Sequence, residues 1–254
     1  MSRLDEKLAR IRSGAYKRTD FIIADAKDPD MGPGLYSHGP IRLNDGSMPR
    51  LRNRAEFLET IRDVINQDIV APGVGFPMHP HRDMEIFSYV LKGAIEHRDS
   101  LGNQAQVRPG QIQVMSAGTG VRHSEVNPSA TEPLHLLQVW ILPDRAGLKP
   151  RYAEWTPTVA QSSAAKVLIV SQDGREGSAH ISQDASVYRV KAAAATTVAH
   201  SLASGRGLWF QLIEGEVQVG GVKLAPGDAV SSEDAGDFEF KSAGPVEALL
   251  FDLA

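Results

Sequence analysis

The stretch HPHRDMEIFSYVLKG, residues 79–93, places two histidines two positions apart, before a run of β-branched and aromatic residues that a glycine ends. Such a run is typical of a β-strand. Successive side chains of a strand point to opposite faces, so His79 and His81 share a face if the segment is extended, as Pro80 favours. Two imidazoles directed at one point suit a divalent transition metal, although a single pair of this kind also occurs as a plain surface feature.

A second pair, His123 and Glu125, has the same spacing and follows the Gly-rich turn Ala117–Gly120. If the strands that we expect over 79–92 and 111–126 belong to one barrel, three histidines and one glutamate converge. Four ligands leave two positions of an octahedron open, and catalysis at a metal needs such open positions. The pattern therefore favours a catalytic site over a closed structural one.

Composition limits the classes of function. The chain has 254 residues, 42% of them hydrophobic and 23% charged, with a net charge of −4, and this lacks the basic excess of a nucleic-acid-binding protein. It has no cysteine, which excludes disulfides, thiolate zinc sites and cysteine nucleophiles. The start MSRLDEKLARIRSG has no apolar signal segment, and no apolar run approaches the roughly 18 residues of a membrane helix. We expect a cytoplasmic protein without membrane contact.

The pattern of short apolar runs and turns predicts a mainly β chain. Residues 2–13 are expected to form one short helix that Ser2 caps and Gly14 ends. After Val64, short β-rich runs alternate with turn signals, which favours a sandwich or barrel. The segment 143–163, which contains three prolines, is the best candidate for a linker.

An internal repeat supports a second barrel. Ile86–Gly93 is similar to Leu208–Gly215 at an offset of 122 residues, and Val107–Gly110 is similar to Leu224–Gly227 at an offset of 117. Each copy has the order strand, glycine turn, strand, Pro-Gly turn, as expected for a repeated β-barrel unit.

The repeat predicts two domains, residues 1–145, with an N-terminal extension over 1–20, and residues 146–254. At the two offsets, the four candidate ligands fall in the second copy on Ser201, Ala203, Phe240 and Ser242. We therefore expect metal ligands in the first barrel only. His200 is one residue out of this register and is expected to face away from the equivalent site.

The candidate ligands lie in a pattern that resembles the two-part metal motif of the cupin superfamily. Its first half is matched by Gly73, His79, His81, Glu85 and Gly93, and its second half by Gly110, Gly118, His123 and Asn127, with Ser116 where proline is usual. Within the cupins, the segments HPHRDMEI, EHRDSLGN and MSAGTGVRHSE resemble the pirin family, and this resemblance covers about residues 64–145. The first 60 residues depart from the usual pirin start.

This resemblance implies an all-β bicupin, with two antiparallel β-barrels of the jelly-roll type, here with the short N-terminal helix added. It implies a single metal in the N-terminal barrel, with the ligands His79, His81, His123 and Glu125. Iron(II) is the usual occupant, and Zn, Mn, Co, Ni or Cu are alternatives. Glu125 is also the expected catalytic residue, as a ligand and transient proton acceptor.

The resemblance implies a quercetin 2,3-dioxygenase-like oxidoreductase, whose partners are O₂ and a small aromatic substrate, a flavonol or a related aromatic enediol. One alternative is an iron-dependent, redox-sensing regulatory protein that acts through a protein partner. A cupin isomerase or hydrolase is a further alternative. The sequence has no GxGxxG, P-loop or nucleophile elbow, so neither a nucleotide cofactor nor serine hydrolysis is expected.

Other polar residues have plainer expectations. Glu85 is four residues after His81, so on one continuous strand both side chains would share a face, and Glu85 stays an alternative ligand. Its other expected role is pairing with Arg82 or Arg122. His97 is expected to satisfy its hairpin by hydrogen bonds. The remaining expectations are a structural His135, an exposed His180, a possible pocket position for His38, and a substrate wall or core position for Phe76, Met78 and Phe87.

Overall fold

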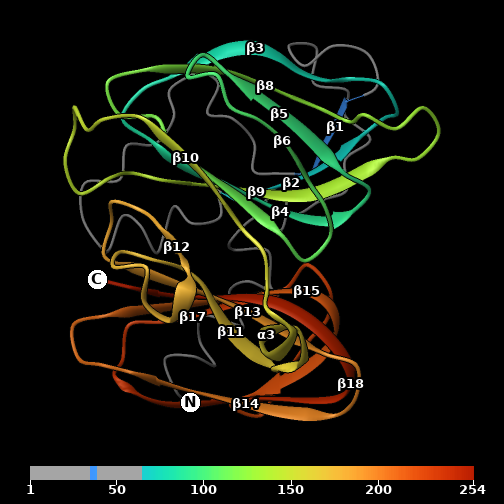
Figure 1. The fold of residues 1–254 in the computed structure, drawn as a ribbon. Helices are drawn as coiled ribbons and strands as arrows, with labels where there is room; N and C mark the ends of the chain where they lie inside the picture. The colour runs from blue at the N-terminus through green and yellow to red at the C-terminus, as the bar shows by residue number, and fades with distance from the viewer. Residues whose placement is uncertain (1–34, 39–64) are drawn as a thin grey trace.

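The structure, a computed structural model, describes residues 35–38 and 65–254 (Figure 1). Most regular structure in these ranges is strand, and the prediction of an all-β chain with two barrels is confirmed. The expected helix over 2–13 lies outside the described residues. Among the described residues there is no helix long and apolar enough to cross a membrane.

The N-terminal half consists of two facing antiparallel sheets. Its strands are β1 (Leu35–His38), β2 (Ile65–Val70), β3 (Gly75–His81), β4 (Glu85–Lys92), β5 (Ile95–Asp99), β6 (Gln104–Val107), β7 (Ile112–Ser116), β8 (Val121–Val126), β9 (Leu134–Ile141) and β10 (Arg151–Trp155). One sheet has the order β1-β2-β9-β4-β7-β10, and the other has the order β3-β8-β5-β6.

The C-terminal half begins with the short helix α3 (Val159–Ser163). Its further elements are β11 (Lys166–Ser171), the 3₁₀ turn η2 (Arg175–Gly177), β12 (Ala179–His180), β13 (Ala185–Ala192), β14 (Thr196–Leu202), β15 (Gly207–Val219), β16 (Val222–Leu224), β17 (Ala229–Ser232) and β18 (Gly236–Leu253). The strand order is β12-β11-β13-β18-β15-β16, with β14 paired to β18 and β17 to β15. All described pairs are antiparallel except β11 with β12.

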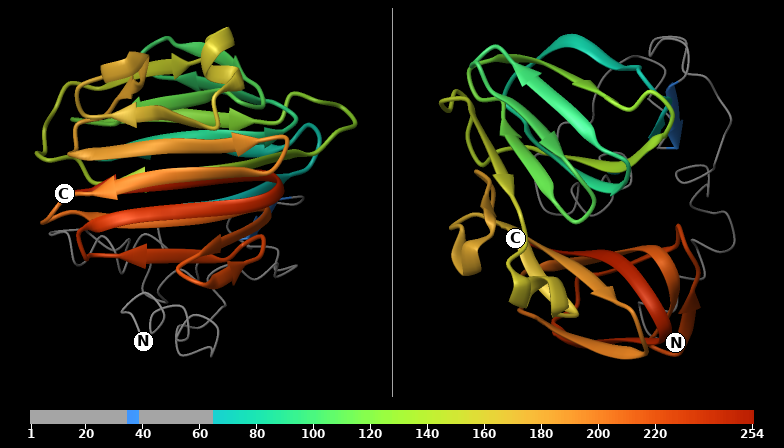
Figure 2. Two further views of the ribbon diagram at one scale, coloured as in Figure 1. Left: turned by 90° about the horizontal axis from the view of Figure 1, so that it is seen from below. Right: turned by 45° about the vertical axis from the view of Figure 1, so that its right-hand side comes forward.

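The two halves pack sheet on sheet (Figure 2). Strand β4 is buried along its first six residues, because one face lines the first barrel and the other meets the second half. On the latter face, Phe87 and Tyr89 join one apolar cluster with Trp209 and Phe251. The Tyr89 hydroxyl also donates to Glu247 across this interface.

The segment predicted as a linker, 143–163, contains both β10 and α3. Strand β10 pairs with β7 of the first barrel. The predicted division of the chain at 145/146 stays a prediction, and the pairing of β10 favours a division between Trp155 and Lys166.

One glycine allows the strands under the candidate site to meet. A Cβ atom on Gly75 of β3 would lie 2.2 Å from the main-chain oxygen of Glu125 in β8. Any other residue would push these strands apart, so Gly75 is needed for their pairing.

Candidate metal centre

The β3-β8-β5 sheet brings the predicted histidines together. His79 lies directly opposite His123 in the β3–β8 pair, and Asp99 lies opposite His123 in the β5–β8 pair. Directly paired residues project from the same face of a sheet, and His81 joins them from two positions along β3. This face looks into the first barrel.

The three histidine rings, His79, His81 and His123, converge. The Nε2 atoms of His79 and His123 are 3.0 Å apart, and the His81 ring centroid is 4.7 Å from that of His79 and 4.9 Å from that of His123. The Nδ1 atom of His79 is 2.7 Å from the Pro77 carbonyl oxygen. Because a carbonyl oxygen only accepts, Nδ1 of His79 carries the proton and its Nε2 has a free lone pair.

These rings fit a divalent metal. Two nitrogens that bind one ion at about 2.1 Å and at a right angle lie about 3.0 Å apart, as those of His79 and His123 do. The Nε2 atom of His81 is buried and has no hydrogen-bond partner among the described residues. Burial and the neighbouring histidines lower the pKa of both His81 and His123 to about 3, so their rings are neutral at pH 7 and have a lone pair for a metal.

Glu125 lies beside this group. Its carboxylate forms a second group with His123 and His97, whose ligand atoms all lie within 4.8 Å of one another. His123 belongs to both groups, whereas Glu125 is grouped with neither His79 nor His81. The predicted set of four ligands around one metal therefore stays a prediction. Burial raises the pKa of Glu125, and hydrogen bonds to its carboxylate partly offset this effect.

A row of polar side chains on the facing sheet holds the Glu125 carboxylate. Ser88 of β4 lies opposite both Gln113 of β7 and Gln138 of β9, so the three side chains share one face. Ser88 Oγ donates to Glu125 over 3.3 Å, Gln138 Nε2 over 2.7 Å, and Gln113 Nε2 also donates. The orientation of the carboxylate is thus set by both sheets.

His97 belongs to the centre, which sequence reasoning missed. It bonds to Asp99 within its own hairpin, as expected, with 3.3 Å between Nε2 and Oδ2. Its ring is also fully buried, its Nδ1 is 3.5 Å from Nδ1 of His123, and it stacks on Tyr152 at 4.4 Å. The signal available in the sequence was the two-residue spacing of His97 and Asp99. That spacing places both side chains on one face of a strand, with Glu96 and Arg98 on the other.

The alternative ligand Glu85 lies elsewhere. Glu85 does not share a face with His81, because the chain turns at Asp83, which has a φ of 49°, and passes from β3 into a strand of the other sheet. Glu85 accepts from Ser116 Oγ over 2.6 Å and is 3.8 Å from Arg151. Glu85 therefore pairs with Arg151, and the expected pairing with Arg82 or Arg122 is wrong. Arg82 lies against Asp83 instead.

The other predicted residues do not join the centre. His135 bonds to Gln67 over 2.7 Å and His180 is exposed, both in line with expectation. The side chain of His38 lies outside the described part of the structure. Among the wall candidates, Phe87 is in the core between the halves, Phe76 packs on an apolar cluster, and Met78 is 46% exposed.

An open pocket of about 410 Å³ borders His81. Its lining comes from the end of β3, the start of β8 and the β5–β6 hairpin, and includes Arg82, Ser100 and Arg122. Phe76, Met78 and Phe87 do not line it. Of the three-histidine group only His81 lines it, and Pro80 and Arg122 lie opposite each other on the other face of the β3–β8 pair.

The second barrel retains one histidine in the equivalent position. Val198 lies opposite Phe240 as His79 lies opposite His123, which makes His200 the counterpart of His81, at an offset of 119. The expectation that His200 faces away is therefore wrong. It is buried and bonds to Asp252 and Lys166, each over 2.9 Å.

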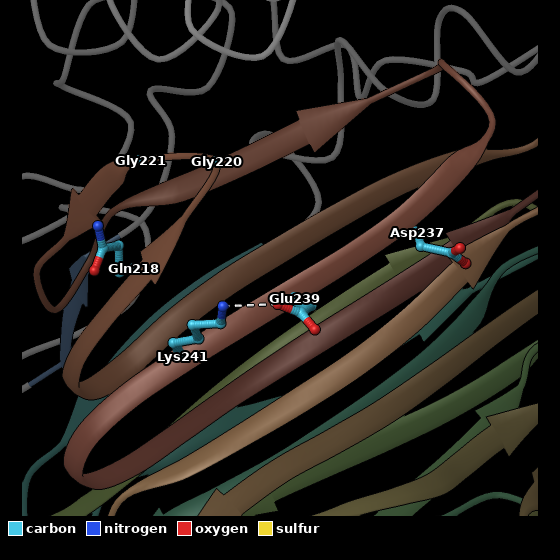
Figure 3. Close-up of a pocket in the computed structure, with 6 residues that line it drawn as sticks. All are labelled: Gln218, Gly220, Gly221, Asp237, Glu239 and Lys241. Carbon is cyan, nitrogen blue, oxygen red and sulfur yellow. Dashed lines mark ion pairs between the residues drawn. The ribbon is translucent and has the colours of Figure 1, made fainter.

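The other three equivalent positions of the second barrel hold Val198, Phe240 and Ser242. Both groups of potential metal ligands in the described ranges accordingly lie in the first barrel. A further pocket of about 510 Å³ on the second half is lined by Gln218, Gly220, Gly221, Asp237, Glu239 and Lys241 (Figure 3). Lys241 pairs with Glu239 over 2.7 Å there, and no histidine lines it.

Comparison with known proteins identifies the relatives of this chain. The sequence profile of the pirin family matches residues 44–141, and that of the quercetinase C-terminal cupin domain matches residues 168–253. The quercetin 2,3-dioxygenase of Escherichia coli K12 is 44% identical over 190 residues, which are 75% of this chain and 81% of that protein. A putative quercetin 2,3-dioxygenase of Pasteurella multocida is 42% identical over 194 residues, with 75% and 81% covered.

Comparison with solved structures points to the same family. YhhW of Escherichia coli superimposes with a TM-score of 0.76 at 37% identity, over 90% of this chain and 96% of that one. A structure described as bacterial pirin YhhW in complex with nickel(II) gives a TM-score of 0.71 at 38% identity, over 92% and 89%.

Proposed function

This chain belongs to the pirin family, and on that premise we propose that it is a metal-dependent dioxygenase that cleaves quercetin-like flavonols or related aromatic enediols. The observation that carries the proposal is the convergence of three histidine rings next to a buried carboxylate inside one barrel. The name of the Escherichia coli relative supports the substrate class.

The metal would be held by His79, His81 and His123 through Nε2, with Glu125 as the fourth ligand that the family resemblance implies. Imidazole and carboxylate donors suit iron, and they also suit zinc, nickel and copper. We propose iron(II) as the native ion. When bound, it would supply Lewis acidity toward the hydroxyl and carbonyl oxygens of the substrate and redox capacity toward O₂.

Glu125 would take the proton of the substrate hydroxyl at one of its carboxylate oxygens. Three donors from the facing sheet, Ser88, Gln113 and Gln138, hold that carboxylate in place. Because Glu125 is buried, water is kept from the proton-accepting oxygens. A group fixed in this way loses little orientation when the substrate arrives.

Trp140 would form one wall of the site. Its ring meets that of His81 edge to face at 4.7 Å, and its Nε1 donates to Gln138 over 2.9 Å. The indole therefore links the three-histidine group to the polar row that holds Glu125.

The test compares metals in one preparation. Metal-free protein is reloaded with iron(II), nickel(II) or zinc(II), and the visible absorption of quercetin is followed in air and under nitrogen. The proposal predicts that quercetin is consumed only in air and only by metal-loaded protein. Equal consumption by metal-free protein, or none with any of the ions, would contradict it.

The regulatory alternative and the cytoplasmic location stay predictions. A pull-down whose partner changes between the iron(II) and iron(III) forms would support a redox-sensing role. A set of partners that is indifferent to the metal would count against it.

A further inference from the structure

We propose that Asp99 and His97 form a hydrogen-bonded relay that keeps the ring proton of His123 on Nδ1 and so reserves Nε2 of His123 for the metal. This inference rests on the proposed metal centre but not on the identity of the substrate. His97 and Asp99 are positioning residues, since they act on the centre through His123.

Asp99 is the fixed end of the relay. Its Oδ1 accepts from the main-chain N–H groups of Leu101 and Asn103, both over 2.9 Å, and its Oδ2 accepts from Asn103 Nδ2 over 2.8 Å. These bonds fold the β5–β6 hairpin around the carboxylate, whose side chain is fully buried. Oδ2 also lies 3.3 Å from Nε2 of His97.

The direction of each proton follows from the chemistry of the groups. A carboxylate only accepts, so Nε2 of His97 carries the hydrogen, and Nδ1 of a neutral His97 has a lone pair. That Nδ1 is 3.5 Å from Nδ1 of His123, which must then be the donor. Nε2 of His123 is left with a lone pair, 3.0 Å from Nε2 of His79.

The ring of His97 is held in the plane that this relay requires. Tyr152 of β10 stacks on it at 4.4 Å with an interplanar angle of 21°. Strand pairing adds to this constraint, because His97 lies opposite Glu125 and Asp99 lies opposite His123 in the β5–β8 pair. The relay thus runs along one face of two neighbouring strands.

The ring proton of His79 is also held on Nδ1, where the acceptor is the Pro77 carbonyl oxygen at 2.7 Å. In metal-binding histidines, the nitrogen that does not bind the metal commonly donates to a carboxylate or a carbonyl group. His123 reaches its carboxylate through a second imidazole instead.

Asp99→Asn leaves the shape of the side chain unchanged but reverses the direction of the hydrogen bond between His97 and residue 99. The amide oxygen can still accept from the main-chain N–H groups of Leu101 and Asn103. The amide nitrogen replaces Oδ2 and donates to His97, and the Asn103 side-chain amide, which now donates to Oδ2, must turn its oxygen toward it. His97 then carries its proton on Nδ1, and His123 is driven to carry its proton on Nε2, where the metal should bind. We expect zinc(II) and nickel(II) to bind about 10–100-fold more weakly, measured by competition with a chelator.

The matched control is Glu96→Gln. Glu96 is adjacent to His97 on β5 and pairs with Arg98 over 2.9 Å, so this variant removes a charge from the same strand without touching the relay. Its zinc(II) affinity should stay within about twofold of the unchanged chain, by the ordinary weakness of surface ion pairs. Asp99→Asn protein that binds zinc(II) as tightly as this control would overturn the proposal.

A second measurement needs no variant. Ring-nitrogen NMR of the zinc-loaded, unchanged chain should show the hydrogen of His97 on Nε2 and that of His123 on Nδ1. A hydrogen on Nδ1 of His97 would overturn the relay. Neither measurement involves quercetin or O₂, so a missing dioxygenase activity would count against the proposed function and leave this result standing.

Discussion

His79 and His123 lie directly opposite each other on β3 and β8, with their Nε2 atoms 3.0 Å apart. Antiparallel pairing places the two Cβ atoms close together on one face of the sheet. The separation suits two ligands of one ion, so the register of β3 on β8 decides whether the centre exists. Each of the first three predictions below changes a residue in that strand pair.

His123 is shared by both groups of potential ligands, so His123→Ala should remove the metal and the turnover together. Metal content after anaerobic loading with iron(II), and quercetin consumption in air, provide the two measurements. His180→Ala is the control, because His180 is exposed and lies in the second half. Quercetin turnover by His123→Ala protein that holds no metal would contradict the assignment.

Glu125→Gln keeps the size of the side chain but replaces an acceptor oxygen with a donor against the amides of Gln113 and Gln138. We expect metal binding to weaken about 10–100-fold and turnover at saturating metal to fall about 100-fold or more, since the proton acceptor is lost. The measurements are a chelator competition and steady-state kinetics.

Glu154→Gln is the control for that variant, because Glu154 is an exposed residue of β10. It should leave both quantities unchanged. If Glu125→Gln protein at saturating metal turned over quercetin at the native rate, Glu125 would have no part in the chemistry.

Gly75→Ala tests the strand pairing itself. The added Cβ would lie 2.2 Å from the main-chain oxygen of Glu125, so β3 and β8 must separate. We expect the free energy of unfolding, measured with urea, to fall by about 1–3 kcal/mol, with a parallel loss of metal binding.

Gly244→Ala is the matched control, since a Cβ there meets nothing within 4 Å and its φ does not require glycine. It should change the free energy of unfolding by less than about 0.5 kcal/mol. Equal effects of the two substitutions would show that the close approach at Gly75 does not matter.

The second barrel provides a pH prediction. Burial raises the pKa of Asp252, but hydrogen bonds from His200 and Arg206 outweigh this and leave it below its ordinary value of 3.8. A carboxyl group with a lowered pKa in the folded state stabilises the fold above its unfolded-state pKa. That contribution is lost as the pH falls through the folded-state pKa.

Asp252→Asn should therefore be less stable than the unchanged chain at pH 7, and the difference should shrink below about pH 4. Urea unfolding of both proteins between pH 2.5 and 7 measures it. A difference that stays constant down to the lowest pH would mean that the Asp252 ion pairs do not contribute to stability.

The sequence predicted the three-histidine group because the period-2 rule holds within a strand. His79 and His81 share a face for that reason, and the Gly-rich turn before His123 placed a second strand nearby. The rule fails for Glu85, because the turn at Asp83 passes the chain to another sheet.

The register between strands was harder to predict. His200 proved to be the counterpart of His81 at an offset of 119, whereas the neighbouring strand pattern indicated 122. Loop lengths and bulges set this register, and they are not visible in the periodicity of one strand. His97 was missed for a related reason, since its burial depends on the β5–β8 pairing and on Tyr152 from β10.

The central claim is tested most directly by oxygen uptake. Protein loaded anaerobically with iron(II) is placed in an oxygen electrode with and without quercetin, beside His123→Ala protein treated in the same way. The account predicts uptake that depends on quercetin and is absent in the variant. No uptake by protein shown to hold iron would contradict a dioxygenase acting on flavonols.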